Sequence, residues 1–272
     1  MRRSLPCLLL LCCLTPWPAA AATPAAPPSA TALQHASQLM EASGLRLMVK
    51  SFSGFIGQSL SPMQPGLPPE AARRLAEKAA IAFAPGYLDQ VVTEVLAGRL
   101  NDRDLTQLLA WHDTAVGRRV TALENARTRS LLQDDPPADV APSSRARQKL
   151  LDRLMQAANA PDMMLDMQMQ VMTATFRGMS AAAVNGDNPL DITPLLKELE
   201  KQRPALRERI RQEMANDLRV TYAPLSNADL QQYVRFHESP LGRRFNLAVQ
   251  QAMQAGLREA GETFGQLLVD DR

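Results

Sequence analysis

Residues 100–120 read LNDRDLTQLLAWHDTAVGRRV, and residues 225–245 read LSNADLQQYVRFHESPLGRRF. Aligned without gaps at an offset of 125, the two segments are identical at eight of 21 positions. Most other positions are conservative exchanges, such as Trp111 for Phe236. An internal repeat at this separation indicates a duplicated unit. A residue kept in both copies is then explained more easily by folding of each copy than by a single active site.

The first part of each segment predicts a short, capped helix. Asn101 and Ser226 lie at N-cap positions, and Asp104 and Asp229 follow three residues later, which resembles a capping box. The residues that we assign to the repeated motif are Asp104, Leu105, Trp111, His112, Gly117 and Arg118 in the first segment, and Asp229, Leu230, Phe236, His237, Pro240, Gly242 and Arg243 in the second.

The second part of each segment predicts a turn into a new helix. Thr114 and Ser239 are suitable N-caps, and Pro240 would occupy the favoured first helical position. Gly117 and Gly242 fall one turn into the new helix, where glycine costs up to about 1 kcal/mol in helix propensity. We therefore expect these glycines to permit a close approach of two helices at the corner.

The composition outside the two segments is also helical. Aromatic residues make up 4% of the chain, no stretch alternates β-branched residues, and Ala, Leu, Gln, Arg, Glu and Met are abundant. We predict an all-α fold of two tandem helical domains with no β-sheet. Upstream of the hairpins, helices are expected at 33–60, 69–96 (interrupted at Pro85-Gly86), 145–183 and 192–222.

The N-terminus indicates export. Arg2 and Arg3 precede an apolar run and a small-residue cleavage site at 20–22, which is typical of a secretory signal peptide. All three cysteines lie within this segment, so the mature chain would contain no disulfide. We therefore expect a Gram-negative periplasmic protein. The predicted organisation is a signal peptide at 1–22, a disordered tether at 23–31, a first domain at 32–132, a linker at 133–144 and a second domain at 145–272.

The charge balance restricts the partners. Without Arg2 and Arg3, the 30 basic residues fall to 28, which equals the 28 acidic residues. A neutral chain argues against general affinity for nucleic acid. No segment after the signal has the length of uninterrupted apolar sequence that a membrane span requires.

The order Tyr222 followed by LSNADLQQYVRFHESPLGRRF resembles the core of a domain family of unknown function that is common in Gram-negative periplasmic proteins. That core reads roughly Y…(F/L)-s-x-x-(E/D)-L…F-Y-x-(S/T)-P-x-G-(K/R)-K. The second segment departs from it at His237, where the family has Tyr, and the first departs at Ala115 and Trp111. The resemblance implies an all-helical exported protein and supplies no catalytic residues.

Motifs for catalysis or metal binding are missing. His112 and His237 occupy equivalent positions, but no HxxxH, HExxH or CxxC accompanies them, so we expect structural roles in which the rings bond the last carbonyls of their helix. There is no GxSxG elbow and no phosphate loop. We predict no enzyme activity and no cofactor, while a carboxylate pair formed only in space stays open.

The arginine pairs and a cluster of methionines can each be explained either by a structural role or by ligand binding. For the pairs Arg118-Arg119 and Arg243-Arg244 we favour one solvated arginine and one bridging to a neighbouring acid over an anion clamp. Seven methionines fall within 155–179, where core packing is favoured over a binding groove. The methionines that we select as candidate partner-binding residues are Met163, Met164, Met167, Met169 and Met172.

These features favour binding over catalysis. We expect a periplasmic protein-binding protein, specifically an immunity protein that neutralises an antibacterial toxin delivered to the envelope. The alternative is a chaperone or adaptor for envelope or secretion machinery, which would have many weakly bound clients. The partner would be a protein, and a homodimer is left open.

Overall fold

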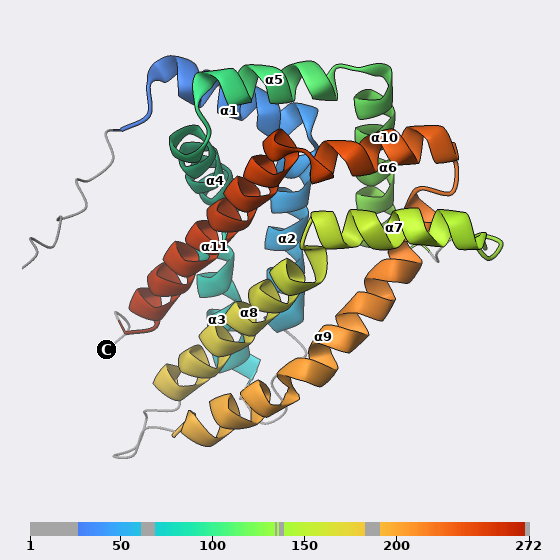
Figure 1. Cartoon of the computed structure of the whole chain (residues 1–272). Coiled ribbons are helices and arrows are strands. Elements are labelled where there is room, and N and C mark those ends of the chain that lie inside the picture. The colour runs from blue at the N-terminus through green and yellow to red at the C-terminus, as the bar shows by residue number, and fades with distance from the viewer. Residues whose placement is uncertain (1–26, 61–68, 134, 136–138, 183–190, 270–272) are drawn as a thin grey trace, which may run out of the picture.

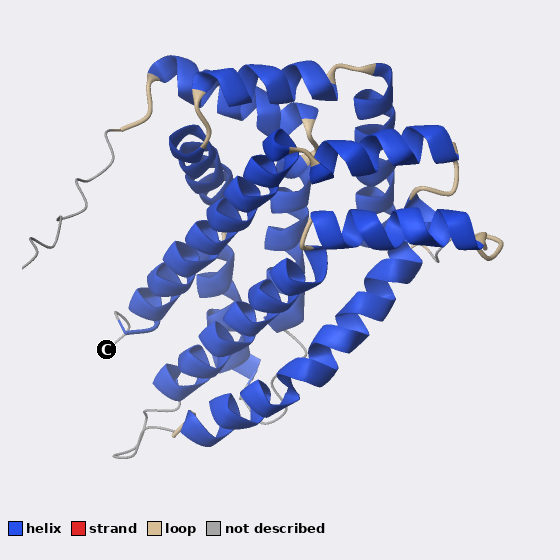
Figure 2. Cartoon of the chain, in the orientation of Figure 1, coloured by secondary structure: helices blue, strands red, loops and turns tan. Residues whose placement is uncertain are grey.

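The computed structural model describes residues 27–60, 69–133, 135, 139–182 and 191–269. All regular structure in these ranges is helical, which confirms the predicted all-α class (Figures 1 and 2). The predicted signal peptide lies outside the described residues. The helices are α1 (Ala30–Ala42), α2 (Leu45–Leu60), α3 (Pro69–Ala82), α4 (Pro85–Arg99), α5 (Asp102–His112), α6 (Ala115–Leu132), α7 (Arg145–Ala157), α8 (Ala160–Ala182), α9 (Thr193–Thr221), α10 (Asn227–Glu238) and α11 (Pro240–Val269).

Two helices that we expected to be continuous are each divided. The stretch 33–60 breaks between α1 and α2 at Gly44, whose φ is 76°, and 145–183 breaks between α7 and α8 at Asn159, whose φ is 50°. Glycine and asparagine tolerate this left-handed conformation better than other residues, so each ends one helix and redirects the next. The continuous helices that we predicted there were wrong. In contrast, α9 runs on through Pro204.

The caps of the two hairpins are as predicted. In each case, a side-chain oxygen accepts a hydrogen bond from the backbone N–H three residues later, which satisfies an otherwise unpaired donor of the first turn. The four caps are Asn101 to Asp104 (2.8 Å), Thr114 to Gly117 (3.0 Å), Ser226 to Asp229 (3.1 Å) and Ser239 to Gly242 (3.0 Å). Pro240 is the first residue of α11.

The corner glycines stand against backbone, as expected. A Cβ atom at Gly117 would lie 2.4 Å from the Trp111 carbonyl oxygen, and one at Gly242 would lie 2.0 Å from that of Phe236. Such distances are far below van der Waals contact. The α5–α6 and α10–α11 corners therefore require glycine.

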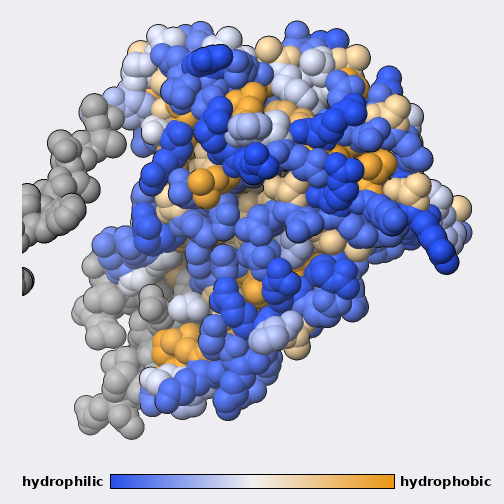
Figure 3. All heavy atoms as spheres, in the orientation of Figure 1, coloured by the Kyte–Doolittle hydropathy of each residue, from blue (hydrophilic) through white to orange (hydrophobic). Residues whose placement is uncertain are grey.

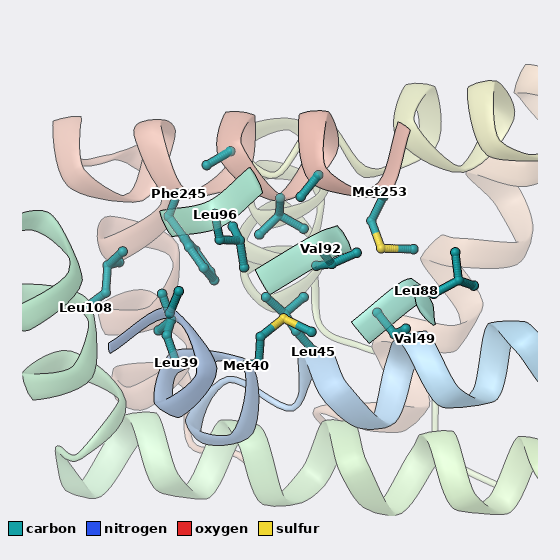
Figure 4. Packing of buried hydrophobic residues seen from close by; sticks show 14 of the residues in the cluster. Leu39, Met40, Leu45, Val49, Leu88, Val92, Leu96, Leu108, Phe245 and Met253 are labelled. Atoms are coloured by element: carbon teal, nitrogen blue, oxygen red, sulfur yellow. The ribbon is translucent and has the colours of Figure 1, made fainter. Parts of the chain in front are cut away.

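One cluster of buried apolar side chains contains residues from both halves of the chain. The long helix α11 packs against α3, α4 and α5 as well as against α8 and α10. Figure 4 shows Phe245 and Met253 of α11 beside Leu96 and Val92 of α4. Leu105 and Leu230, which occupy equivalent positions in the two segments, are both fully buried. The α11 helix thus joins the N-terminal helices to the C-terminal ones.

Among the described helices, none combines the length and the apolar character that a membrane crossing would require.

Candidate functional site

The two similar segments pack directly against each other. Trp111 of α5 stacks on Phe236 of α10, with ring centroids 3.8 Å apart and planes inclined by 17°. Trp111 also stacks on Tyr233, at 5.7 Å. These aromatic contacts place the ends of α5 and α10, and the histidine that follows each aromatic residue, at one location.

Ion pairs across this contact are reciprocal. Arg119 binds Asp229 at 2.6 Å, and Arg244 binds Asp104 through two hydrogen bonds of 2.9 and 2.7 Å. Arg119 and Arg244 occupy equivalent positions in the two segments, and so do Asp104 and Asp229, so each arginine binds the aspartate of the other segment. The hydrogen bonds from Arg244 hold the pKa of the Asp104 carboxyl below its usual value. In the second pair Arg244 bridges and Arg243 is exposed, as interpreted, whereas in the first pair Arg118 also forms an ion pair, with Asp113 at 2.5 Å.

The two histidines bond to the helix that follows, not to the last carbonyls as predicted. His112 Nδ1 lies 3.5 Å from Thr121 Oγ1, and His237 Nδ1 lies 2.9 Å from Asn246 Oδ1. Both partners are nine residues further along the chain. Burial lowers the pKa of each imidazole to about 4, because charge is unfavourable away from water. Both rings are therefore neutral near pH 7.

A carboxyl group that the sequence analysis missed lies beside the histidines. Oε1 of Glu124, on α6, accepts hydrogen bonds from the hydroxyls of Tyr222 at 2.5 Å and Tyr233 at 2.7 Å. Burial raises the pKa of Glu124, and the two tyrosine hydrogen bonds oppose this shift. Glu124 follows Val116 and Val120 at intervals of four, so an acidic residue on the apolar face of α6 was the available signal.

These groups line a cavity of about 290 Å³. Its polar lining consists of His112, Glu124, Tyr233 and His237 together with Ser43, Asn125, Thr128 and Asn246, and most of the remaining wall is apolar. The two unpredicted helix breaks contribute Gly44 and Ala158, respectively, to the wall. The cavity therefore depends on features that helical periodicity alone does not reveal.

A second, larger concavity of about 760 Å³ lies between α8, α9 and α11. In Figure 1, α8 runs between α11 and α9, and it packs against both. Asp166, Met169, Gln170 and Thr173 line it from one face of α8. We call this concavity the α8 groove. Arg203 of α9 binds Asp166 at 2.6 Å and so links these two helices.

The candidate methionines do not form one binding surface. Met167 is buried in the core, and Met163, on the same helix face, packs against the core and lines the smaller cavity. Met164 is exposed, Met172 is half-buried, and Met169 lines the α8 groove. The face of the molecule in Figure 3 likewise shows hydrophobic residues in separate small groups within a mostly hydrophilic surface.

Within the described ranges, no group of three or more His, Cys, Asp or Glu side chains is placed to share a metal ion. In comparisons with known proteins, the chain matches no sequence family, no curated protein and no solved structure.

Proposed function

We propose that this chain is an exported, non-enzymatic binding protein that holds a helical segment of a protein partner in the α8 groove. The observation that carries the proposal is the groove itself, an open concavity of about 760 Å³ bordered by three helices. Gln170 on its α8 side has a buried Oε1 with no hydrogen-bond partner among the described residues. A buried acceptor is costly when unpaired, so a donor from a partner would stabilise it.

The dimensions of the groove fit a helix. The α11 wall extends from Gln254 to Gly265, and at about 1.5 Å per residue it is roughly 16 Å long, about three helical turns. Leu257 and Phe264 lie at the base of the same wall, where they are almost fully buried in the core, and Glu200 and Arg203 line the α9 side with polar groups. A helix that packs closely over the glycines of α11 and bonds the polar groups of α9 matches this arrangement.

At Gly265 the α11 wall of the groove has no side chain, which leaves open space above the backbone. A Cβ atom at Gly265 would meet nothing within 4 Å, so packing within the chain does not require glycine at this position. Glycine inside a helix nevertheless costs about 1 kcal/mol relative to alanine. The open space above Gly265 is therefore available to a partner.

The sequence supports a periplasmic location through its signal-like N-terminus and cysteine-free remainder. In that compartment, we propose an immunity protein that occludes a toxin delivered into the envelope. Its partner would be one protein bound tightly. From Thr23 onward the chain is formally neutral, with 28 basic and 28 acidic residues, so its charge does not favour nucleic acid or an anionic surface.

The test is capture of partners from an envelope extract by the chain from Thr23 onward, followed by affinity measurement. Gly265→Leu should block the groove and reduce partner affinity by at least about tenfold, because a bulky group would replace partner contacts. Gly98→Leu is the matched control, since a Cβ there also meets nothing within 4 Å and Gly98 lies on α4, outside the groove.

One tight partner that is lost in Gly265→Leu and kept in Gly98→Leu would support the proposal. Equal binding by both variants would refute the groove as the site. Recovery of many weak clients would favour the chaperone or adaptor function over immunity.

A further inference from the structure

The smaller cavity contains a buried polar atom that the chain does not satisfy. His112 is 7% exposed, and its Nε2 has no hydrogen-bond partner among the described residues. His112 lines the cavity. A buried ring nitrogen without a partner is unfavourable, and a ligand in the cavity would supply the missing bond.

The hydrogen bonds around His112 determine which of its ring nitrogens carries the proton and which can accept a hydrogen bond from a ligand. Thr121 Oγ1 donates its proton to the Ala42 carbonyl at 3.1 Å, so toward His112 the hydroxyl can only accept. Nδ1 of His112 therefore carries the ring proton, because a neutral imidazole has one donor and one acceptor nitrogen. Its Nε2 is left as an acceptor.

His237 has the same tautomer for a parallel reason. Asn246 donates through Nδ2 to the Ala157 carbonyl at 2.9 Å, which directs its Oδ1 toward His237 Nδ1. That oxygen can only accept, so His237 Nδ1 is the donor and Nε2 is the acceptor.

Most donors in the cavity wall are already used within the chain. They donate to neighbouring oxygens of the chain, and the remaining polar wall residue, Asn125, is a neutral amide. The used donors are Ser43 Oγ to the Leu39 carbonyl (2.7 Å), Thr128 Oγ1 to the Glu124 carbonyl (2.9 Å), Tyr233 Oη to the Glu124 carboxylate (2.7 Å) and Asn246 Nδ2 to the Ala157 carbonyl (2.9 Å).

No lysine or arginine is among the described residues that line the cavity. Its polar side therefore presents His112 Nε2, the carboxyl of Glu124 and the neutral amide of Asn125, with no cationic group in the described part of the wall, and its apolar side includes Phe236, Phe245 and Met48. We propose that this cavity binds a small organic ammonium ion, whose N–H groups bond His112 Nε2 and Glu124 and whose apolar body packs against the aromatic rings. A bound cation would favour the ionised form of Glu124, and aromatic faces attract cations.

The size of the cavity limits the ligand. A volume of about 290 Å³ corresponds to roughly ten water molecules at about 30 Å³ each. A ligand of roughly ten non-hydrogen atoms fits this space. This site differs from the α8 groove in position and in ligand class, so the two proposals can fail independently.

The experiment is calorimetric titration of the chain from Thr23 onward with three probes of similar shape at neutral pH. We expect saturable binding of 2-phenylethylammonium, weaker binding of 2-phenylethanol and no binding of 3-phenylpropionate. Nitrogen NMR of the histidine rings should show the His112 Nε2 signal shifting with the ammonium probe. The absence of saturable ammonium binding, or equal binding of the carboxylate, would overturn the proposal.

Glu124→Gln tests the role of the charge. The amide oxygen can still accept both tyrosine hydroxyls, while ammonium affinity should fall by about tenfold or more through loss of a charge-assisted hydrogen bond. Binding of 2-phenylethanol should change little. The matched control is Glu259→Gln, because Glu259 also accepts a tyrosine hydroxyl, that of Tyr87 at 3.1 Å, but at an exposed position. Unchanged ammonium affinity in Glu124→Gln, or an equal loss in Glu259→Gln, would contradict the proposal.

Discussion

His112 and His237 link the stability of the protein to pH. Burial lowers the pKa of each from 6.5 to about 4, so the unfolded chain binds more protons than the folded one between these values. Stability is then fully retained above about pH 6.5 and declines as the pH falls toward 4. The shift corresponds to on the order of 3 kcal/mol for each histidine. Protonation of Glu124 acts in the opposite sense, because burial raises its pKa.

We therefore expect His237→Asn to reduce the pH dependence of stability. Its amide can still donate toward Asn246, but it does not titrate, so the decline between pH 6.5 and 4.5 should be smaller by roughly 2 kcal/mol. Urea unfolding at several pH values measures this difference. An equal slope in the variant and the parent would show that His237 is not responsible.

The two reciprocal ion pairs should contribute unequally to the free energy of unfolding. The Asp104 side chain is 5% exposed and that of Asp229 is 22% exposed. Arg244→Ala leaves a buried carboxylate without its partner, and we expect a loss of about 3 kcal/mol. Arg119→Ala leaves a carboxylate that water can reach, and we expect about 1 kcal/mol or less. Chemical denaturation of both variants at pH 7 tests the order, and equal losses would contradict it.

Glu124 shows what sequence reasoning can and cannot reach at the scale of a residue. Its place on an apolar helix face could have marked it as unusual. Its partners, however, lie 98 and 109 residues away in the chain. No local sequence pattern connects Glu124 to these tyrosines. The hydrogen-bonded group and the cavity beside it could therefore be identified only from the structure.

At the scale of elements, the corner glycines should be among the least replaceable residues. Gly242→Ala places a methyl group against the Phe236 carbonyl, and the helix start must move to relieve the overlap. We expect a loss of about 3 kcal/mol or more in unfolding free energy. Gly98→Ala, with open space around its Cβ, should instead stabilise the protein by up to about 1 kcal/mol. Thermal melts of the two variants should move in opposite directions, and similar shifts would refute the argument.

The sequence predicted helix starts better than helix breaks. Caps such as Thr114 and Ser239 are local, since the side chain bonds a backbone group only three residues away. At Gly44 and Asn159 the apolar pattern continues without interruption. The pattern therefore predicted one continuous helix at each place, whereas the structure has two helices separated by a residue with positive φ. A single glycine or asparagine is compatible with both outcomes, and tertiary packing decides between them.

At the scale of the whole molecule, the shared buried cluster predicts cooperative unfolding of the two halves. From Thr23 onward, Trp111 is the only tryptophan in the chain, and it stacks on Phe236 of the other half. Its fluorescence therefore reports the contact between halves, while far-UV circular dichroism reports all helices. We expect coincident urea transitions by the two methods. An earlier fluorescence transition would show that the halves separate before they unfold.

The position of α11 in the chain has a consequence for biosynthesis. This helix leaves the ribosome after all the other described helices, yet α3 and α4 bury part of their apolar surface against it. Until it is made, side chains such as Leu88 and Val92 lack their Met253 neighbour (Figure 4). The N-terminal half therefore cannot complete its packing during synthesis, and part of its apolar surface stays exposed until α11 is made. For the export that we propose, such a delay would keep the chain unfolded long enough to pass through an export channel.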